Sequence, residues 1–178
     1  MIVIVDTIAR HRTAMSRTML SKPMQQAFAD GLFEHGAGLF DYGCGRGDDL
    51  RTLTALGVQA GGWDPAHSPD SDRTPSNVVN LGYVVNVIED RSERADALQQ
   101  AWALTTSVLV VSARLTWDPD STSGKPYLDG RLTGNGTFQK YYTPEELKAW
   151  IESTLGQTAI TAAPGICYVF RDPASAQQ

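Results

Sequence analysis

The chain alternates between short apolar runs and stretches in which apolar positions recur every three or four residues. Short apolar runs are typical of buried strands, and the second spacing is typical of helices with one buried face. The predicted strands are residues 39–42, 58–63, 78–81, 107–113, 158–162 and 166–171, and the predicted helices are residues 23–30, 48–56, 92–104 and a segment that begins after Thr143. Strands that alternate with helices favour an α/β fold with a mostly parallel sheet and helices on both faces.

Two segments interrupt this pattern. Residues 65–77 hold three prolines and almost nothing apolar, which predicts a loop. Residues 114–142 are polar, carry four glycines and end in an aromatic cluster. A segment of this length without secondary structure is typically functional or disordered. We therefore predict a mobile lid that brings side chains to a substrate; they are Trp117, Phe138, Lys140, Tyr141 and Tyr142. The alternative is a surface excursion whose aromatic residues serve as an anchor.

Length and composition predict one domain spanning residues 1–178. Hydrophobic residues make up 42% and charged residues 20%, and no apolar run approaches the ~20 residues of a membrane span. Charged residues interrupt the apolar N-terminus, so we expect no signal peptide and a cytoplasmic location. The two cysteines have no metal-site spacing, and no metal is expected.

The formal net charge of −5 argues against a nucleic-acid partner, because such proteins concentrate Lys and Arg against phosphates. One basic cluster lies near the N-terminus and includes Arg12 and Arg17. It is either a solvated helix face or a substrate contact, and we carry Arg12 and Arg17 as candidate substrate-binding residues.

Three glycines, Gly43, Gly45 and Gly47, lie between the first predicted strand and the following helix. Glycine adopts positive φ readily and lets the backbone approach a ligand closely, and the helix directs unpaired N–H groups at the same place. The next predicted strand ends in Asp64, about 20 residues after Asp41, where an acidic side chain can hold ribose hydroxyls. The spacing predicts a nucleotide-binding turn that is neither the dinucleotide fingerprint nor a phosphate-binding loop.

Asp41 followed by G-x-G-x-G resembles the first motif of the S-adenosylmethionine (SAM) dependent methyltransferases of the Rossmann-like class. The resemblance implies that SAM is the cofactor and S-adenosylhomocysteine the product. It implies cofactor contacts at Asp41, Gly43, Gly45, Gly47 and Asp64. A full methyltransferase sheet would have a helix and an edge strand where residues 65–77 lie, so the resemblance also predicts a trimmed edge.

Residues 80–90 leave the central strand at the crevice where open α/β sheets bind ligands. By the same resemblance, Asn80 and Leu81 border the methionine part of the cofactor, and Tyr83 leans over the sulfonium. The sequence is not the Asn/Asp-Pro-Pro-Tyr/Phe of amino-directed DNA methyltransferases. The alternative is a strand end that caps the next helix.

Residues 8–155 also resemble the N-terminal part of methyltransferase-like proteins found beside DNA phosphorothioation genes, through residues 11–17, 40–49, 62–65, 80–90 and 136–142. The chain is similar as well to the small methyltransferase-like partners of radical SAM enzymes that build cyclopropanes in natural products. These resemblances imply a radical SAM enzyme as one candidate partner.

Methyl transfer needs mainly alignment, and a general base only if the acceptor carries a tightly held proton. The candidate catalytic residues are His11, Glu89, Tyr141 and Tyr142. Three functions stay open: a SAM-dependent enzyme acting on a small, largely aromatic molecule, a nucleic-acid methyltransferase, and a non-catalytic SAM-binding protein.

Overall fold

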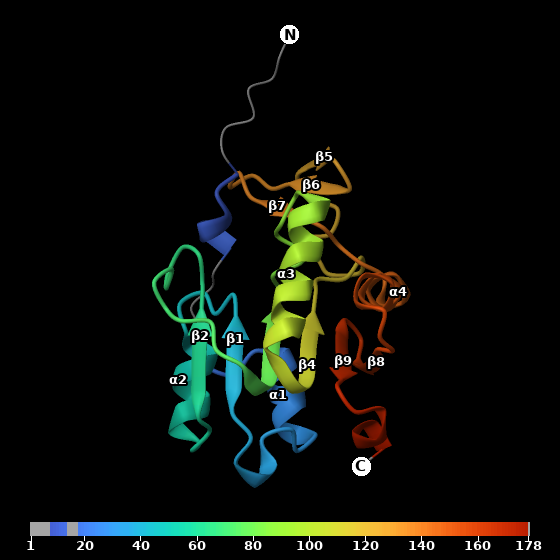
Figure 1. Cartoon of the computed structure of the whole chain (residues 1–178). Coiled ribbons are helices and arrows are strands. Elements are labelled where there is room, and N and C mark those ends of the chain that lie inside the picture. Colours follow the sequence, from blue (N-terminus) through green and yellow to red (C-terminus); the bar gives the residue numbers. More distant parts are fainter. Residues whose placement is uncertain (1–7, 14–17, 178) are drawn as a thin grey trace.

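Six strands form the central sheet of this computed structural model, which describes residues 8–13 and 18–177. The strand order is β2-β1-β3-β4-β9-β8. The first four strands are parallel, β9 runs antiparallel to β4, and β8 pairs with β9 as a hairpin (Figure 1). Their bounds are β1 Leu39–Tyr42, β2 Ala60–Trp63, β3 Ser76–Gly82, β4 Thr105–Ser112, β8 Ile160–Ala163 and β9 Ile166–Phe170.

Helices cover both faces of this sheet, as the sequence predicts. They are α1 Lys22–Ala29, α2 Asp48–Ala55, α3 Arg91–Leu104 and α4 Pro144–Leu155, with short 3-10 helices η1 Arg10–Thr13, η2 Glu34–Gly36 and η3 Pro173–Gln177. Met24 of α1 and Leu53 of α2 belong to the core on one face. Leu98 of α3 and Ile151 of α4 belong to the core on the other.

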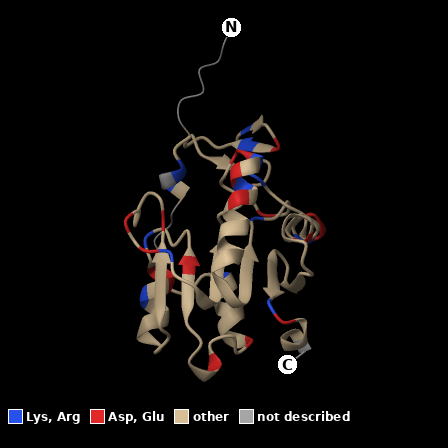
Figure 2. Cartoon of the chain, viewed as in Figure 1, with Lys and Arg blue, Asp and Glu red and all other residues tan. Residues whose placement is uncertain are grey.

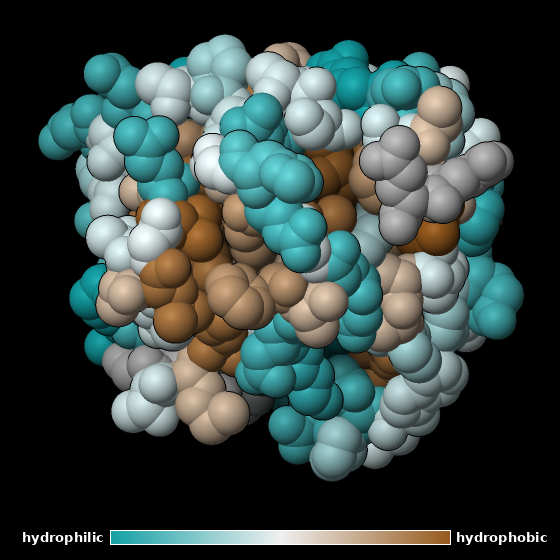
Figure 3. All heavy atoms as spheres, turned by 90° about the horizontal axis from the view of Figure 1, so that it is seen from below, coloured by the Kyte–Doolittle hydropathy of each residue, from teal (hydrophilic) through white to brown (hydrophobic). Residues whose placement is uncertain are grey.

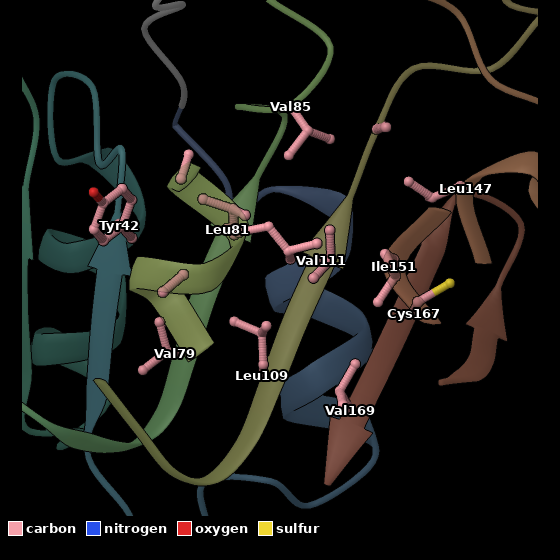
Figure 4. Packing of buried hydrophobic residues seen from close by; sticks show 14 of the residues in the cluster. Tyr42, Val79, Leu81, Val85, Leu109, Val111, Leu147, Ile151, Cys167 and Val169 are labelled. Atoms are coloured by element: carbon pink, nitrogen blue, oxygen red, sulfur yellow. The ribbon is translucent and has the colours of Figure 1, made fainter. Parts of the chain in front are cut away.

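The two central strands are apolar on both sides. Val79 and Leu81 of β3 point toward α3 and α4, with Leu109 of the neighbouring strand (Figure 4). Val78 and Val108 point the opposite way, toward α1 and α2. This burial on both faces explains why these strands read as continuous apolar runs in the sequence.

The sheet ends at β2, so the predicted trimmed edge is confirmed. Residues 64–75 form a loop and contribute no strand. The predicted second strand begins two residues too early, because Val58 N–H donates to the carbonyl of Leu53 and so ends α2 instead of starting β2. Thr143 caps α4 by accepting from Glu146 N–H, as its capping box predicts.

Residues 114–142 contain a small antiparallel sheet, which corrects the expectation of a structureless segment. Its strands are β5 Lys125–Tyr127, β6 Gly130–Leu132 and β7 Phe138–Gln139. A Cβ on Gly124 would lie 2.1 Å from the carbonyl oxygen of Leu132, and one on Gly130 would lie 2.5 Å from that of Gln139. These glycines therefore permit close packing of the backbone in this sheet.

Within the described ranges, no helix has the length and apolar character that crossing a membrane requires. The lower face of the molecule, at the amino ends of the parallel strands, exposes apolar atoms between polar side chains (Figure 3). The glycine turn and Asp64 lie at the opposite end of the sheet (Figure 1).

Candidate functional site

A cavity of about 490 Å³ lies at the carboxyl ends of β1, β2 and β3. Open α/β sheets bind their ligands at this position. The predicted cofactor residues at its wall are Asp41, Gly43, Gly45, Asp64, Asn80 and Tyr83. The side chain of Leu81 is fully buried in the core, and Gly47 begins α2 behind the turn.

The glycine turn is held close to its neighbours. The backbone φ values of Gly43, Gly45 and Gly47 are 88°, 52° and 75°, which residues other than glycine rarely adopt. Gly43 N–H donates to the carbonyl of Trp63 over 2.7 Å, which ties the turn to the end of β2. A Cβ on Gly43 would lie 2.4 Å from Cγ2 of Val84, so this position has no room for a side chain.

The carboxylate of Asp64 is oriented by backbone N–H groups. Its Oδ2 accepts from Gly45 N–H at 2.9 Å, and its Oδ1 accepts from Ala66 and His67 N–H at 2.9 and 3.0 Å. A carboxylate offers about four lone-pair sites, so one site, on Oδ2, remains for a hydroxyl of a ligand. Asp64 therefore links the glycine turn to the loop after β2 and presents an acceptor to the cavity.

Asn80 carries a buried acceptor at the cavity wall. Its Nδ2 donates to Oδ1 of Asp41 at 2.9 Å, and both residues are nearly inaccessible. Asn80 Oδ1 is one of three buried side-chain atoms that lack a hydrogen-bond partner within the described residues. An unsatisfied buried acceptor costs about 1–3 kcal/mol, which a ligand N–H or O–H could recover.

Tyr83 follows β3 with an unusual backbone. Its φ is +57°, and its N–H donates to the carbonyl of Ser112 at 3.0 Å. Positive φ in a bulky residue is strained, and such strain clusters at ligand sites. Tyr83 lies at the wall of the cavity, and its place over the sulfonium stays a prediction.

Cys44 lies inside the turn and lines the cavity. Burial, together with the charges of Asp41 and Asp64, raises the pKa of its thiol to about 11. The thiol is protonated at neutral pH and is therefore a poor nucleophile. No cluster of residues suited to a metal ion occurs in the part of the chain that the structure describes.

The N-terminal segment reaches the cavity through Arg10 and Thr13, two residues that the sequence analysis did not assign. Arg10 Nε and Nη2 donate to Glu89 at 3.0 and 2.7 Å, and the same guanidinium pairs with Glu93 of α3. Figure 2 places the charged first turns of α3 and the basic residues of η1 at the same end of the molecule.

This ion pair changes the interpretation of Glu89. Burial acts to raise the pKa of Glu89, but the hydrogen bonds and charge of Arg10 outweigh it, so the pKa lies below its usual value. A carboxylate that holds protons so weakly is a poor general base at neutral pH. Glu89 is placed to anchor Arg10.

Four candidate residues from the segment 114–142 do not line the cavity. Phe138 and Tyr142 are buried in the protein, Lys140 pairs with Glu146 at 2.7 Å, and Tyr141 OH donates to the carbonyl of Asp120. This placement matches the alternative in which the aromatic residues of 114–142 act as an anchor. A contact with substrate would require the segment to move.

Trp117 is 62% exposed, and Arg12 donates to the carbonyl of Asn135 at 3.4 Å. His11 lies in η1, but its side chain falls outside what the structure describes. Arg17 also lies outside the described residues. The roles proposed for these four residues stay predictions.

Solved structures share this architecture. The CcbJ methyltransferase from Streptomyces caelestis matches with a TM-score of 0.57 and 13% identity, over 93% of this chain and 95% of that one. The sugar N-methyltransferase KedS8 from Streptoalloteichus sp ATCC 53650 matches with a TM-score of 0.57 and 14% identity, over 84% and 86%. SAM-bound CalS10, an amino pentose methyltransferase from Micromonospora echinaspora, matches with a TM-score of 0.53 and 17% identity, over 92% and 94%.

At these identities the likeness establishes the fold, which is the Rossmann-like fold of SAM-dependent methyltransferases. No protein-family model and no curated protein matches the sequence.

Proposed function

We propose that this chain is a SAM-dependent methyltransferase that acts on a small, natural-product-type molecule. One observation carries the proposal: the glycine turn, the oriented carboxylate of Asp64 and the buried side chain of Asn80 line one cavity. The names of the structural neighbours agree with this function, since KedS8 and CalS10 are a sugar and an amino pentose methyltransferase by their descriptions.

The donor and acceptor groups of the cavity fit SAM. Asp64 would accept from a ribose hydroxyl, as acidic residues do at this position of nucleotide-binding sheets. Gly43 and Gly45 would let the backbone lie against the ligand. Asn80 would border the amino-acid part, and its buried, unpaired Oδ1 would accept from a ligand N–H only after the cavity wall moves to uncover it.

When bound, SAM supplies a methyl group that is already activated by the positive sulfonium. The chain's contribution is placement, because correct alignment of reacting groups can lower a barrier by several kcal/mol. Val84, Val87 and Ile88 give the cavity an apolar wall that limits the access of water. Glu93 and Asp96 add carboxylates to the lining, which favours a ligand that carries positive charge.

The acceptor is proposed to be a small and largely aromatic molecule. A general base among His11, Tyr141 and Tyr142 remains part of this proposal, while the ion pair of Glu89 argues against that residue. The alternative reaction is cyclopropane closure on an adduct that a radical SAM partner has made. The two differ in consumption of SAM: only methyl transfer converts added SAM to S-adenosylhomocysteine.

Calorimetric titration with S-adenosylhomocysteine tests the proposal. The wild-type chain should bind, and Asp64→Ala should weaken binding by about ten-fold or more, because hydrogen bonds to a charged group contribute about 1.5–3 kcal/mol. Asp70→Ala is the matched control, since Asp70 is an exposed carboxylate in the same loop and does not line the cavity. Equal affinity in wild type and Asp64→Ala would contradict the assignment.

A further inference from the structure

The loop after β2 occupies the position where a further strand would flank the cavity. It turns back sharply, with Ser68 N–H donating to the carbonyl of Asp64 at 2.9 Å and Trp63 Nε1–H donating to the carbonyl of Pro69 at 3.2 Å. This turn returns Arg73 to the cavity that Asp64 lines.

Arg73 is held at three points, one of them a hydrogen bond from its Nη1 to Tyr42 OH at 3.4 Å. Its guanidinium carbon lies 4.6 Å from the centre of the Trp63 ring, and its Nη1 donates to Oε1 of Gln100 at 2.9 Å. The same Gln100 oxygen accepts from Tyr42 OH at 2.7 Å, and the rings of Tyr42 and Trp63 are 5.1 Å apart. The guanidinium of Arg73 is therefore the point where the loop meets β1, β2 and α3. The residues that make these contacts all line the cavity: Arg73, Tyr42, Trp63 and Gln100.

This arrangement suits a flat, uncharged ring. A guanidinium is planar, so one face can rest on an indole while the other stacks on a second aromatic system. Because Oε1 of Gln100 already accepts two hydrogen bonds, its amide nitrogen is the group left to donate to a ring nitrogen. Ala97, one turn before Gln100 on α3, adds apolar surface to the same wall.

We propose that Arg73, seated on Trp63 and held by Gln100, closes the adenine end of the cofactor cavity and stacks on the purine. Asp64 and Arg73 line the same cavity, so a purine attached to a ribose at Asp64 would lie within reach of the guanidinium. The loop after β2 would thus form the part of the cavity wall that lies where a full methyltransferase sheet has its edge strand. The inference rests on the proposed function.

The test uses calorimetry with S-adenosylhomocysteine and with 5′-methylthioadenosine, which shares the adenosine and lacks the amino acid. Arg73→Ala should lower the affinity for both ligands by the same factor, about ten-fold. Arg73→Lys should bind both ligands as weakly as Arg73→Ala does, because an ammonium group keeps the positive charge but lacks the planar surface of a guanidinium. Arg91→Ala is the matched control, since the Arg91 side chain is 78% exposed at the start of α3 and does not line the cavity.

Each other outcome overturns a defined claim. Unchanged affinity of Arg73→Ala, with circular dichroism showing an intact fold, would overturn the inference and leave the proposed function standing. Wild-type affinity in Arg73→Lys, or a loss of affinity confined to S-adenosylhomocysteine, would show that Arg73 binds an anionic part of the ligand. Either result would overturn stacking on the purine. Failure of the wild type to bind either ligand would overturn the proposed function, and this inference with it.

Discussion

Single residues decide how closely a ligand can approach the backbone at the carboxyl ends of β1 and β3. Gly43 has positive φ and no room for a Cβ, while Asn80 leaves one buried oxygen unpaired. The unpaired oxygen of Asn80 costs free energy in an ordinary core, and Gly43 stands where glycine alone fits without strain. Both residues line the cavity, which supports the proposed cofactor site.

Gly43→Ala should destabilise the protein. The added Cβ would meet Val84 at 2.4 Å, and φ of +88° is unfavourable for alanine. We expect a loss of about 1–3 kcal/mol and a Tm lower by roughly 3–10 °C, measured by thermal unfolding. Gly61→Ala is the control, because a Cβ on Gly61 would meet no heavy atom within 4 Å and its φ is not positive. Equal Tm values for the two variants would contradict the packing argument.

Cys44 should react slowly with iodoacetamide. With a pKa of about 11, only about one thiol in a thousand is ionised at pH 8. The alkylation rate, followed by peptide mass spectrometry, should rise about ten-fold per pH unit up to pH ~10. The same cysteine in urea provides the reference rate. A rate that levels off near pH ~8.5 in the folded protein would show an ordinary thiol.

The position of helix η1 beside the cavity depends on contacts with two other elements of the fold, α3 and the small sheet of β5, β6 and β7. Helix η1 is held from two directions, because Arg10 binds acidic residues at and before α3, and Ala9 N–H donates to the carbonyl of Gly136 in the turn between β6 and β7. The small sheet of residues 114–142 thus supports the N-terminal segment and does not itself line the cavity.

The attachment of η1 should depend on pH through Glu89. The pKa of Glu89 in the folded chain is lowered, so the ion pair stabilises the fold fully above the ordinary value of 4.5 and is lost as pH falls through the lower folded pKa. Amide exchange of residues 8–13, corrected for its intrinsic pH dependence, should therefore stay slow down to about pH 5 and accelerate below about pH 4.

Arg10→Ala provides the comparison for that experiment. The amides of residues 8–13 should exchange rapidly at every pH in Arg10→Ala. In Arg12→Ala they should keep the wild-type profile, because within the described residues the side chain of Arg12 makes an exposed hydrogen bond of 3.4 Å to the carbonyl of Asn135. A pH step that survives in Arg10→Ala would mean that another group controls η1.

The proposal that residues 114–142 form a lid predicts slower amide exchange in this segment when ligand binds. Because Phe138 is fully buried and packs edge-on against Tyr127, we expect strands β5 to β7 to move as one unit. Hydrogen exchange with and without S-adenosylhomocysteine measures the effect. Equal protection in both states would make the segment a fixed anchor.

The molecule as a whole carries a formal net charge of −5, and its cavity is lined by more acidic than basic side chains. Phosphate backbones are bound through Lys and Arg, so this balance disfavours nucleic acid. The cavity of about 490 Å³ has the size of a small-ligand site, which agrees with the proposed cofactor.

Binding to oligonucleotides should accordingly be weak. Fluorescence anisotropy with duplex and single-stranded DNA should give a Kd above about 1 µM at low salt and no binding near ~150 mM salt. Sub-micromolar affinity at the higher salt would instead support the nucleic-acid alternative.

Features that depend on neighbours along the chain were predictable from the sequence. The order of strands and helices, the glycine turn and the cap at Thr143 follow from apolar spacing and turn chemistry within a few residues. Asp64 was also predictable, because parallel strands joined by one helix end at the same edge of a sheet, which brings it to Gly45.

Only the tertiary structure decided which distant side chains meet. Arg10 and Glu89 are 79 residues apart, and Arg73 and Gln100 are 27 apart, so no local pattern links them. The aromatic cluster of 138–142 showed the same limit: its composition favoured a substrate wall in the sequence, with a buried anchor as the alternative. Packing against α4 and the small sheet buried Phe138 and Tyr142, because the burial of apolar area depends on the whole fold and not on the order of residues nearby.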